Sequence, residues 1–309
     1  MRVLLTGGAG FIGSHIADAL VERGDEVVVI DDLSTGCREN LNPGVRFHQM
    51  DVRSPEAARL VHELRPDIVC HHAAQVSVSR SVREPRLDAE VNLMAALGLL
   101  EATRHVGARF VFASTGGALY GDAAVLPTPE SYPAWPISPY GVSKLAFEHY
   151  LHCYAVQHEI SYVALRYANV YGPRQSPHGE AGVVAIFCQR LLAGERPVIH
   201  GDGRQTRDYV YISDVVRANL AAMDATVSGH FNVGTGRQVD VNHLFQLIAE
   251  RVGTGIEAVH GPPRPGDQRT SALDPSLIAE RLGWRPQVGL EQGLEETVAW
   301  FRARVVAAR

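Results

Sequence analysis

A tyrosine and a lysine four residues apart have the clearest chemical potential in the chain. Tyr140 and Lys144 are the ends of the segment Y-G-V-S-K. Residues four apart share one face of a helix, so the phenol and the ammonium would point the same way. A nearby ammonium favours the phenolate and lowers the pKa of a tyrosine from about 10. The pair could therefore act as a general base toward a substrate hydroxyl, although the same spacing is common on exposed helices.

Two hydroxyl residues precede this pair at the end of an apolar run. Ser114 and Thr115 follow Phe110–Ala113, and Gly116 and Gly117 come next. A hydroxyl at the end of a parallel strand lies at the edge of the sheet where ligands bind, and it can share a proton that a base moves. Strand-end capping is the structural alternative for both residues.

A glycine-rich segment follows the first apolar run. Thr6–Gly13 reads T-G-G-A-G-F-I-G and opens a helical pattern. Gly7 permits a tight turn, Gly10 lets backbone amides approach a pyrophosphate, and Gly13 allows close packing of helix and strand. A glycine turn without a ligand is the alternative, but the strand before the segment and the helix after it favour dinucleotide binding.

Carboxylates follow the next two strand-like runs. Asp31 and Asp32 end the second run, and Asp31 lies 18 residues after Gly13. A carboxylate there can accept hydrogen bonds from a ribose 2′-hydroxyl and repels a 2′-phosphate, which favours NAD over NADP. Asp51 and Val52, after the third run, could reach the adenine, and a helix N-cap is the alternative role for this segment.

Strand-like and helix-like patterns alternate through the first half of the chain, which predicts a parallel sheet with helices on both faces. Right-handed crossovers then give a doubly wound (Rossmann) α/β fold. The expected strands are Val3–Leu5, Glu26–Ile30, Val45–His48, Ile68–His71, Phe110–Ala113 and Tyr162–Leu165. The expected helices are Phe11–Arg23, Pro55–Leu64, Ala89–Val106 and Tyr140–His158.

The pattern changes after Gly172, where a long polar loop begins. We expect a second, smaller α/β domain that binds the substrate, with the NAD-binding domain formed by residues 1–172 and 208–236 and the substrate domain by residues 173–207 and 237–309. The later elements that the sequence indicates are helices at Val183–Leu192, Val241–Val252 and Leu290–Val305 and a strand at His230–Val233.

Composition excludes several classes of protein. The chain has 309 residues, 46% of them hydrophobic and 20% charged, which is ordinary for a globular protein and argues against disorder. A net charge of -5 argues against nucleic-acid binding driven by global positive charge. No apolar run is long enough for a membrane span or a signal peptide. The four scattered cysteines indicate reduced thiols, so we expect a cytoplasmic protein without a membrane partner.

Two pairs of closely spaced histidines could suggest a metal site. They are His71 with His72 and His149 with His152. No carboxylate or cysteine at a suitable spacing completes a ligand set, so we expect no metal.

As a set, the motifs resemble the extended short-chain dehydrogenase/reductase family and, within it, the UDP-glucose (UDP-galactose) 4-epimerases. The resemblance runs over nearly the whole chain. Besides the glycine segment, it rests on D-D-L-S-T-G at Asp31–Gly36, H-H-A-A-Q at His71–Gln75, S-P-Y-G-V-S-K at Ser138–Lys144, L-R-Y-A-N-V-Y-G-P-R at Leu165–Arg174, G-D-G-R-Q-T-R-D-Y at Gly201–Tyr209 and R-P-G-D at Arg264–Asp267.

The resemblance implies a role for each matched residue. Tyr140 would be the base, and Lys144 would bind the nicotinamide ribose and lower the pKa of Tyr140. Thr115, or secondarily Ser114, would assist; their loop is one residue longer than the common epimerase form. The implied NAD contacts are Gly7, Gly10, Phe11, Ile12, Gly13, Asp31, Asp32, Ser34, Thr35, Gly36, Asp51, Val52, His72, Ala73, Ala74, Gln75, Asn92, Ala113, Tyr140, Lys144 and Tyr167.

The resemblance also implies a UDP-sugar site. Arg207 and Arg264 would clamp the diphosphate, since an arginine fork binds phosphate oxygens bidentately. Asn169 would contact the diphosphate as well, and Asp267 would bind the uridine ribose. The full set of implied substrate contacts is Thr115, Gly116, Gly117, Tyr140, Asn169, Gly182, Val183, Val198, His200, Arg207, Tyr209, Arg264 and Asp267.

The implied activity is inversion at C4 of a UDP-hexose through transient oxidation by tightly bound NAD and a 4-keto sugar, as in galactose metabolism. Ser271 would lie near the 2-substituent of the sugar, and its small size predicts activity on UDP-GalNAc as well as UDP-galactose. The family's usual assembly implies a homodimer through the predicted helices Ala89–Val106 and Tyr140–His158.

Three other functions stay open. A nucleotide-sugar 4,6-dehydratase would carry an Asp-Glu pair where this chain has Gly116 and Gly117. A UDP-glucuronate 4-epimerase or decarboxylase would need a cation facing the C6 carboxylate, and the sequence does not identify one. A protein that retains NAD without turnover, as a sensor or scaffold, is the non-enzymatic alternative, and the Tyr140/Lys144 pair argues against it.

Overall fold

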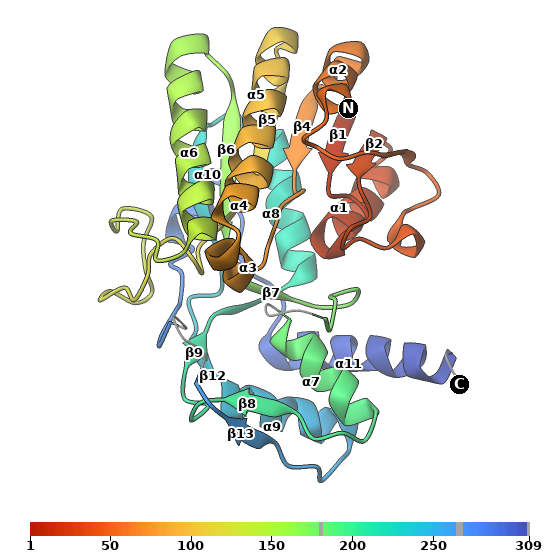
Figure 1. The fold of residues 1–309 in the computed structure, drawn as a ribbon, viewed down its shortest axis with the longest axis vertical. Helices are drawn as coiled ribbons and strands as arrows, with labels where there is room; N and C mark the ends of the chain where they lie inside the picture. Colours follow the sequence, from red (N-terminus) through yellow and green to blue (C-terminus); the bar gives the residue numbers. More distant parts are fainter. Residues whose placement is uncertain (179–181, 264–267, 308–309) are drawn as a thin grey trace.

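A seven-stranded parallel sheet forms the centre of the larger part of the molecule (Figure 1). The structure is a computed structural model that describes residues 1–178, 182–263 and 268–307. The spatial order of the strands is β11-β6-β5-β4-β1-β2-β3. The strands are β1 (Arg2–Thr6), β2 (Glu26–Asp31), β3 (Arg46–Gln49), β4 (Ile68–His71), β5 (Arg109–Thr115), β6 (Tyr162–Tyr167) and β11 (Gly229–Val233).

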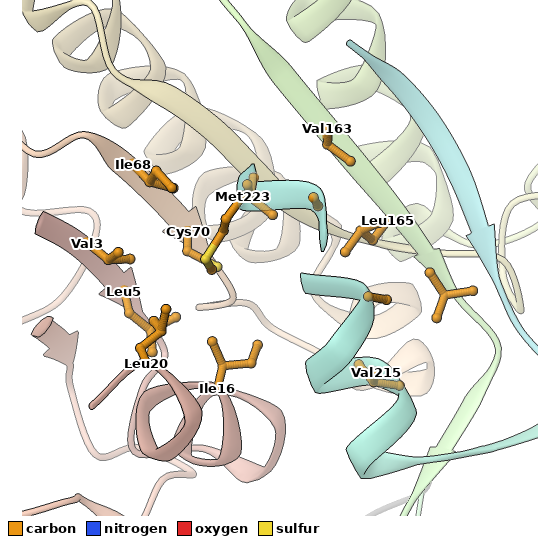
Figure 2. Packing of buried hydrophobic residues seen from close by; sticks show 14 of the residues in the cluster. Val3, Leu5, Ile16, Leu20, Ile68, Cys70, Val163, Leu165, Val215 and Met223 are labelled. Carbon is orange, nitrogen blue, oxygen red and sulfur yellow. The ribbon is translucent and has the colours of Figure 1, made fainter. Parts of the chain in front are cut away.

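One face of the sheet is covered by α1 (Phe11–Glu22) and α8 (Ile212–Asp224), with α10 (Ser276–Leu282) near the β11 edge. Figure 2 shows Ile16 and Leu20 of α1 and Val215 of α8 lying against side chains from β1, β4 and β6. Strands whose side chains are apolar on both faces require helices on both sides, because each face must be removed from water.

The opposite face is covered by α2 (Pro55–Leu64), α5 (Ala95–Val106) and α6 (Pro139–His158). Phe110 and Phe112 of β5 pack against Phe147 of α6, and all three are fully buried. The doubly wound fold predicted from the alternating pattern is therefore confirmed.

The helix expected over Ala89–Val106 is not uniform. The chain instead forms α3 (Val78–Arg83), α4 (Pro85–Ala89), a single π-helical turn η2 (Glu90–Met94) and then α5. A π-helical turn inserts one extra residue and is frequently found at functional sites. Here it carries the fully buried Asn92.

A smaller body lies below the sheet in Figure 1 and is built around three helices, α7 (Val183–Leu192), α9 (Val241–Val252) and α11 (Leu290–Ala307). Short strands join in pairs around it. They are β7 (Asn169–Tyr171) with β10 (Tyr209–Tyr211), β9 (Thr206–Arg207) with β12 (Val239–Asp240), and β8 (Val198–His200) with β13 (Val259–Gly261). The described residues also include a short 3-10 helix, η1 (Arg38–Asn40).

The packing of α10 differs from the domain boundaries expected from the sequence. Those boundaries place residues 237–309 in the substrate domain, whereas Ile278 and Trp284 pack into the core of the large sheet. The Trp284 indole N–H also donates to the backbone carbonyl of Asp214 in α8. The chain therefore returns to the first body before α11 begins.

Candidate active site

The carboxyl ends of four neighbouring strands converge at one edge of the sheet. The register aligns Thr6 of β1 with His71 of β4, and His71 with Phe112 of β5. Thr115 at the end of β5 lies opposite Tyr167 of β6. The glycine loop, the H-H-A-A-Q segment and the two hydroxyls, which are far apart in the sequence, therefore meet at the edge where ligands of doubly wound sheets bind.

The glycine loop fits the phosphate groups of a dinucleotide. Gly7 has a φ of +71° and lies so close to the loop after β4 that a Cβ on it would approach the Ala73 nitrogen to 2.6 Å. At Gly13 a Cβ would lie 2.2 Å from the Gly7 carbonyl oxygen. Gly10, the N-cap of α1, receives no side-chain cap, which leaves the first turn of the helix suited to an anion.

The two aspartates at the end of β2 have different surroundings. Asp31 is buried, and its carboxylate accepts the Ala9 N–H at 2.9 Å and the Leu33 N–H at 2.8 Å. Burial raises the pKa of Asp31, whereas the two backbone hydrogen bonds oppose the rise. Asp32 is exposed and accepts the Ser34 N–H at 2.9 Å. Asp31 thus holds the glycine loop in shape, and Asp32 carries the more accessible carboxylate.

The loop of Ser34, Thr35 and Gly36 packs onto the glycine loop. A Cβ at Gly36 would lie 2.9 Å from the Ala9 carbonyl carbon, and the next residue, Cys37, donates its N–H to the Ala9 carbonyl. These contacts hold the loop of Ser34–Gly36 against the glycine segment, where we expected from the sequence that it would contact the cofactor.

Asp51 forms an ion pair instead of capping a helix. Its carboxylate lies 2.5 Å from the Arg53 guanidinium, which lowers the pKa of Asp51. The N-cap of α2 is Ser54. Val52 is nearly buried in the core that α2 covers, so its side chain mainly packs.

The start of α6 determines where Tyr140 and Lys144 lie. Ser138 is the N-cap and accepts the Gly141 N–H at 3.2 Å, and Pro139 occupies the first turn. Lys144 is 2% exposed, and its Nζ donates to the Ala113 carbonyl at 3.0 Å. The same nitrogen lies 5.9 Å from the centroid of the Tyr140 ring. The helix therefore presents both groups toward the end of β5.

The protein's own groups do not lower the pKa of Tyr140, so this part of the sequence expectation is wrong. Burial raises the pKa of Tyr140 to about 12, and the charge of Asp88 adds to the rise, while a hydrogen bond with Thr115 opposes it. Burial also lowers the pKa of Lys144 to about 8. Removal from water disfavours the charged form of both groups.

The two candidate helper hydroxyls point in different directions. Thr115 makes a side-chain hydrogen bond with Tyr140. Ser114 instead donates to the carboxylate of Glu148 at 2.5 Å, and Glu148 is paired with the buried Arg166. The geometry therefore favours Thr115 over Ser114 as the hydroxyl beside the base.

His72 and Tyr167 are joined by a hydrogen bond of 3.0 Å between His72 Nε2 and the phenol oxygen. The Tyr167 hydroxyl also bonds to Asn219 of α8. Burial lowers the pKa of His72 to about 3, so its ring is neutral at ordinary pH. The contacts make Tyr167 a buried support for the loop after β4.

Gln75 is held by a polar cluster that includes residues the sequence analysis missed. The side chain of Asn92 exchanges hydrogen bonds of 2.9 Å with the backbone of Gln75. Asp88 accepts the side-chain amides of both residues at 2.9 Å and the Ser143 hydroxyl at 2.6 Å. Asn92 therefore fixes the loop of His72–Gln75 in place. The four-residue spacing of Asp88 and Asn92 is the sequence signal for a shared helix face.

The predicted substrate residues lie on several elements around the lower body. Asn169 begins β7, and its amide oxygen would lie 3.9 Å from a Cβ on Gly117. Gly182 is the N-cap of α7, just before Val183. Val198 and His200 lie on β8, Arg207 on β9 and the buried Tyr209 on β10. Arg264 and Asp267 lie outside the described residues.

Two searches of the described residues were negative. No cluster of three or more histidine, cysteine, aspartate or glutamate side chains that could hold a metal ion occurs in the described ranges. Within the same ranges, no helix is both long and apolar enough to cross a membrane.

Comparison with known proteins identifies relatives over the whole chain. The model of the NAD dependent epimerase/dehydratase family matches residues 3–234. The UDP-glucose 4-epimerase of Mycolicibacterium smegmatis is 46% identical over 309 residues, which cover 98% of this chain and 99% of that protein.

Solved structures agree with this similarity. The UDP-glucose 4-epimerase of Thermotoga maritima, solved with UDP-glucose, has a TM-score of 0.96 and 51% identity and covers 99% of this chain and 100% of that chain. The UDP-glucose 4-epimerase of Thermus thermophilus, solved with NAD, has a TM-score of 0.93 and 49% identity and covers 98% and 99% of the two chains.

Proposed function

Because the chain belongs to the NAD dependent epimerase/dehydratase family, we propose that it is a UDP-glucose 4-epimerase that uses bound NAD. The observation that carries the proposal is the placement of Tyr140, Thr115 and Lys144 at the end of β5, on the same carboxyl edge of the sheet at which β1 leads into the glycine loop. Relatives with 46% and 51% identity over nearly the full length bear the same name, and one was solved with the sugar nucleotide.

We assign the cofactor site to the glycine loop, the first turn of α1 and the end of β2. Gly7 and Gly13 allow the loop to pack closely against neighbouring backbone, and the uncapped start of α1 suits the charge of phosphates. Asp31 and Asp32 suit a ribose with a free 2′-hydroxyl, which NAD has. NAD, when bound, supplies the hydride acceptor and donor for C4 and a positive ring charge that favours the Tyr140 phenolate.

Tyr140 is the group that we assign to proton transfer. It removes the proton of the 4-hydroxyl as the sugar is oxidised and returns it after the 4-keto sugar has presented its other face. Thr115 bonds to the phenol oxygen and keeps it aligned with that hydroxyl. Lys144 supplies positive charge beside the phenol and is held by the Ala113 carbonyl.

Rotation of the hexose requires that the nucleotide stays fixed. We assign this role to Arg207 on β9, Asn169 on β7 and the neighbouring backbone of α7 and β8. An arginine suits a diphosphate because its planar fork binds two oxygens together. Arg264 and Asp267 remain part of the proposed UDP site on the strength of the sequence.

The residues after Thr115 disfavour the dehydratase alternative. Elimination of the 6-hydroxyl needs an acid and a second base, and glycine at positions 116 and 117 offers neither. A Cβ at Gly116 would lie 2.3 Å from Leu273 Cδ1, so a larger side chain there would require Leu273 to move.

We also propose a homodimer in the cytoplasm, acting in galactose metabolism. Met94, Val142, Tyr150 and Val156 expose large apolar side chains on η2 and α6, the region through which the dimer would form. All four cysteines are free thiols, which suits a reducing compartment.

The direct test is to incubate the purified protein with UDP-galactose, without added nucleotide, and to follow the sugar by NMR. We expect UDP-glucose to form, because the cofactor is regenerated in each cycle. No conversion, even after NAD is added, would contradict the proposal. The same measurement with UDP-GalNAc tests whether the small Ser271 leaves room for an N-acetyl group on the sugar. We expect turnover of both sugar nucleotides. A preference for UDP-galactose of a thousandfold or more would contradict this role of Ser271.

A further inference from the structure

A buried carboxylate lies next to the catalytic pair with no charged group among its hydrogen-bond partners. Asp88 is 0% exposed. The donors that the structure describes at its two oxygens are the amides of Gln75 and Asn92 and the hydroxyl of Ser143, all of them neutral. Burying an ionised carboxylate without a cation costs several kcal/mol, so a carboxylate at this place needs a reason beyond packing.

The Ser143 hydroxyl that bonds to Asp88 is next in the sequence to a cationic residue, Lys144, on α6. Its Nζ contacts a backbone carbonyl and lies 4.7 Å above the ring of Phe112. The other titratable groups that face Lys144 are Tyr140 and Glu148 on α6 and His71 and His72 at the end of β4.

Among the described residues of this group, Asp88 is the carboxylate without an ion-pair partner. Arg166 neutralises Glu148 at 2.5 Å. Burial keeps the pKa of both His71 and His72 low, so these rings carry no charge. The charge of Asp88, followed by that of Glu148, raises the pKa of Lys144 against the larger effect of burial.

Resting on the proposed function, we propose that Asp88 is a positioning residue that serves as the counterion of Lys144 and ties α6 to the loop of His72–Gln75. The carboxylate keeps the lysine in its ammonium form in a dry site. Its bonds to Ser143 and Gln75 join the helix that carries the base to the loop after β4. The ammonium that the reaction requires thus depends on a side chain from α4, outside the motifs that the sequence analysis matched to the family.

The test compares two variants of the NAD-loaded enzyme. Asp88→Asn removes the charge and keeps a side chain of the same shape, whereas Ser143→Ala removes one hydrogen bond and keeps the charge. We expect the alkaline limb of the kcat–pH profile to move down by about one pH unit in Asp88→Asn, the size of a nearby-charge effect. In Ser143→Ala it should stay in place. Equal shifts, or none in Asp88→Asn, would overturn the counterion role.

A second measurement does not depend on turnover. With NAD at saturation, Tm is measured for Asp88→Asn in the original protein and in a Lys144→Met background. We expect Asp88→Asn to lower Tm more in the original protein, because it leaves a buried ammonium without its counterion. An equal loss of Tm in both backgrounds would refute the counterion role, whatever the substrate is. If the loss of Tm is larger in the original protein but the protein shows no epimerase activity, the counterion role holds and the proposed function alone fails.

Discussion

At the scale of single residues, Tyr140 decides whether the proposed chemistry is possible. Its hydroxyl contacts Thr115, and burial holds its pKa at about 12. We therefore expect Tyr140→Phe to lower kcat at least about 100-fold, the usual size of positioned acid–base catalysis, while NAD stays bound. The measurements are steady-state turnover of UDP-galactose and the amount of nucleotide released on denaturation.

The matched control is Tyr150→Phe, which removes a phenol from the same helix at a position that is 42% exposed. Its kcat should stay close to that of the original protein. A nearly normal kcat in Tyr140→Phe would remove this residue from the mechanism.

A second prediction at this scale concerns pH. His71 is 1% exposed, and burial lowers its pKa well below the ordinary value of 6.5. Below pH 6.5 the unfolded chain binds a proton at this residue and the folded chain does not, so stability is lost as pH falls. We expect the Tm of the protein to fall between pH 7 and pH 5, and to fall less steeply in His71→Asn.

The slope of Tm against pH, and not its value at pH 7, is the informative quantity, because the smaller asparagine also leaves space in the core. His62→Asn is a suitable comparison, since His62 lies on the solvent side of α2. Equal slopes for His71→Asn and the original protein would contradict the expected linkage.

At the scale of elements, the junction of β1 and α1 has no room for a side chain at Gly13. A Cβ at Gly13 would lie 2.2 Å from the Gly7 carbonyl oxygen, a backbone atom that cannot move without opening the turn. We expect Gly13→Ala to cost about 1–3 kcal/mol of stability and to weaken NAD binding. Chemical denaturation and isothermal titration with NAD measure the two effects.

Gly255→Ala serves as the control for this prediction. A Cβ there meets nothing within 4 Å, and the residue does not require the left-handed region. We expect no loss of NAD affinity. If Gly13→Ala behaved like this control, the close contact of helix and strand would not be what shapes the phosphate site.

At the scale of the whole molecule, the exposed apolar residues of η2 and α6 predict self-association. Met94 is 61% exposed and Val156 is 63% exposed, unusual values for side chains that gain from burial. We expect sedimentation of a dimer at micromolar concentration. Val156→Glu should shift the protein toward monomer, because a charge would be buried at the interface.

Val306→Glu is the control for the dimer, since Val306 is 70% exposed on α11, in the other body. It should sediment like the original protein. A monomer at micromolar concentration for the unmodified chain would contradict the proposed assembly.

The alternating elements of the sheet, the glycine loop and the Tyr140–Lys144 pair could all be predicted from the sequence. These features depend on local spacing: period-two and helical patterns, a turn that needs glycine, and two side chains one helical turn apart. The family followed from the same motifs. Their order along the chain was enough, because each motif is a short continuous segment.

The surroundings of the catalytic pair could not be predicted in this way, because they form only when the chain folds. Asp88 of α4 and Arg166 of β6 are distant in sequence from Lys144 on α6, and no local pattern predicts that their charges lie near this helix. The direction of a pKa shift depends on burial and on distances between such groups, so the sequence expectation of a lowered Tyr140 pKa was wrong. Spacing along the chain specifies which residues can act together, whereas desolvation and charge, which set how they act, arise only when distant segments pack.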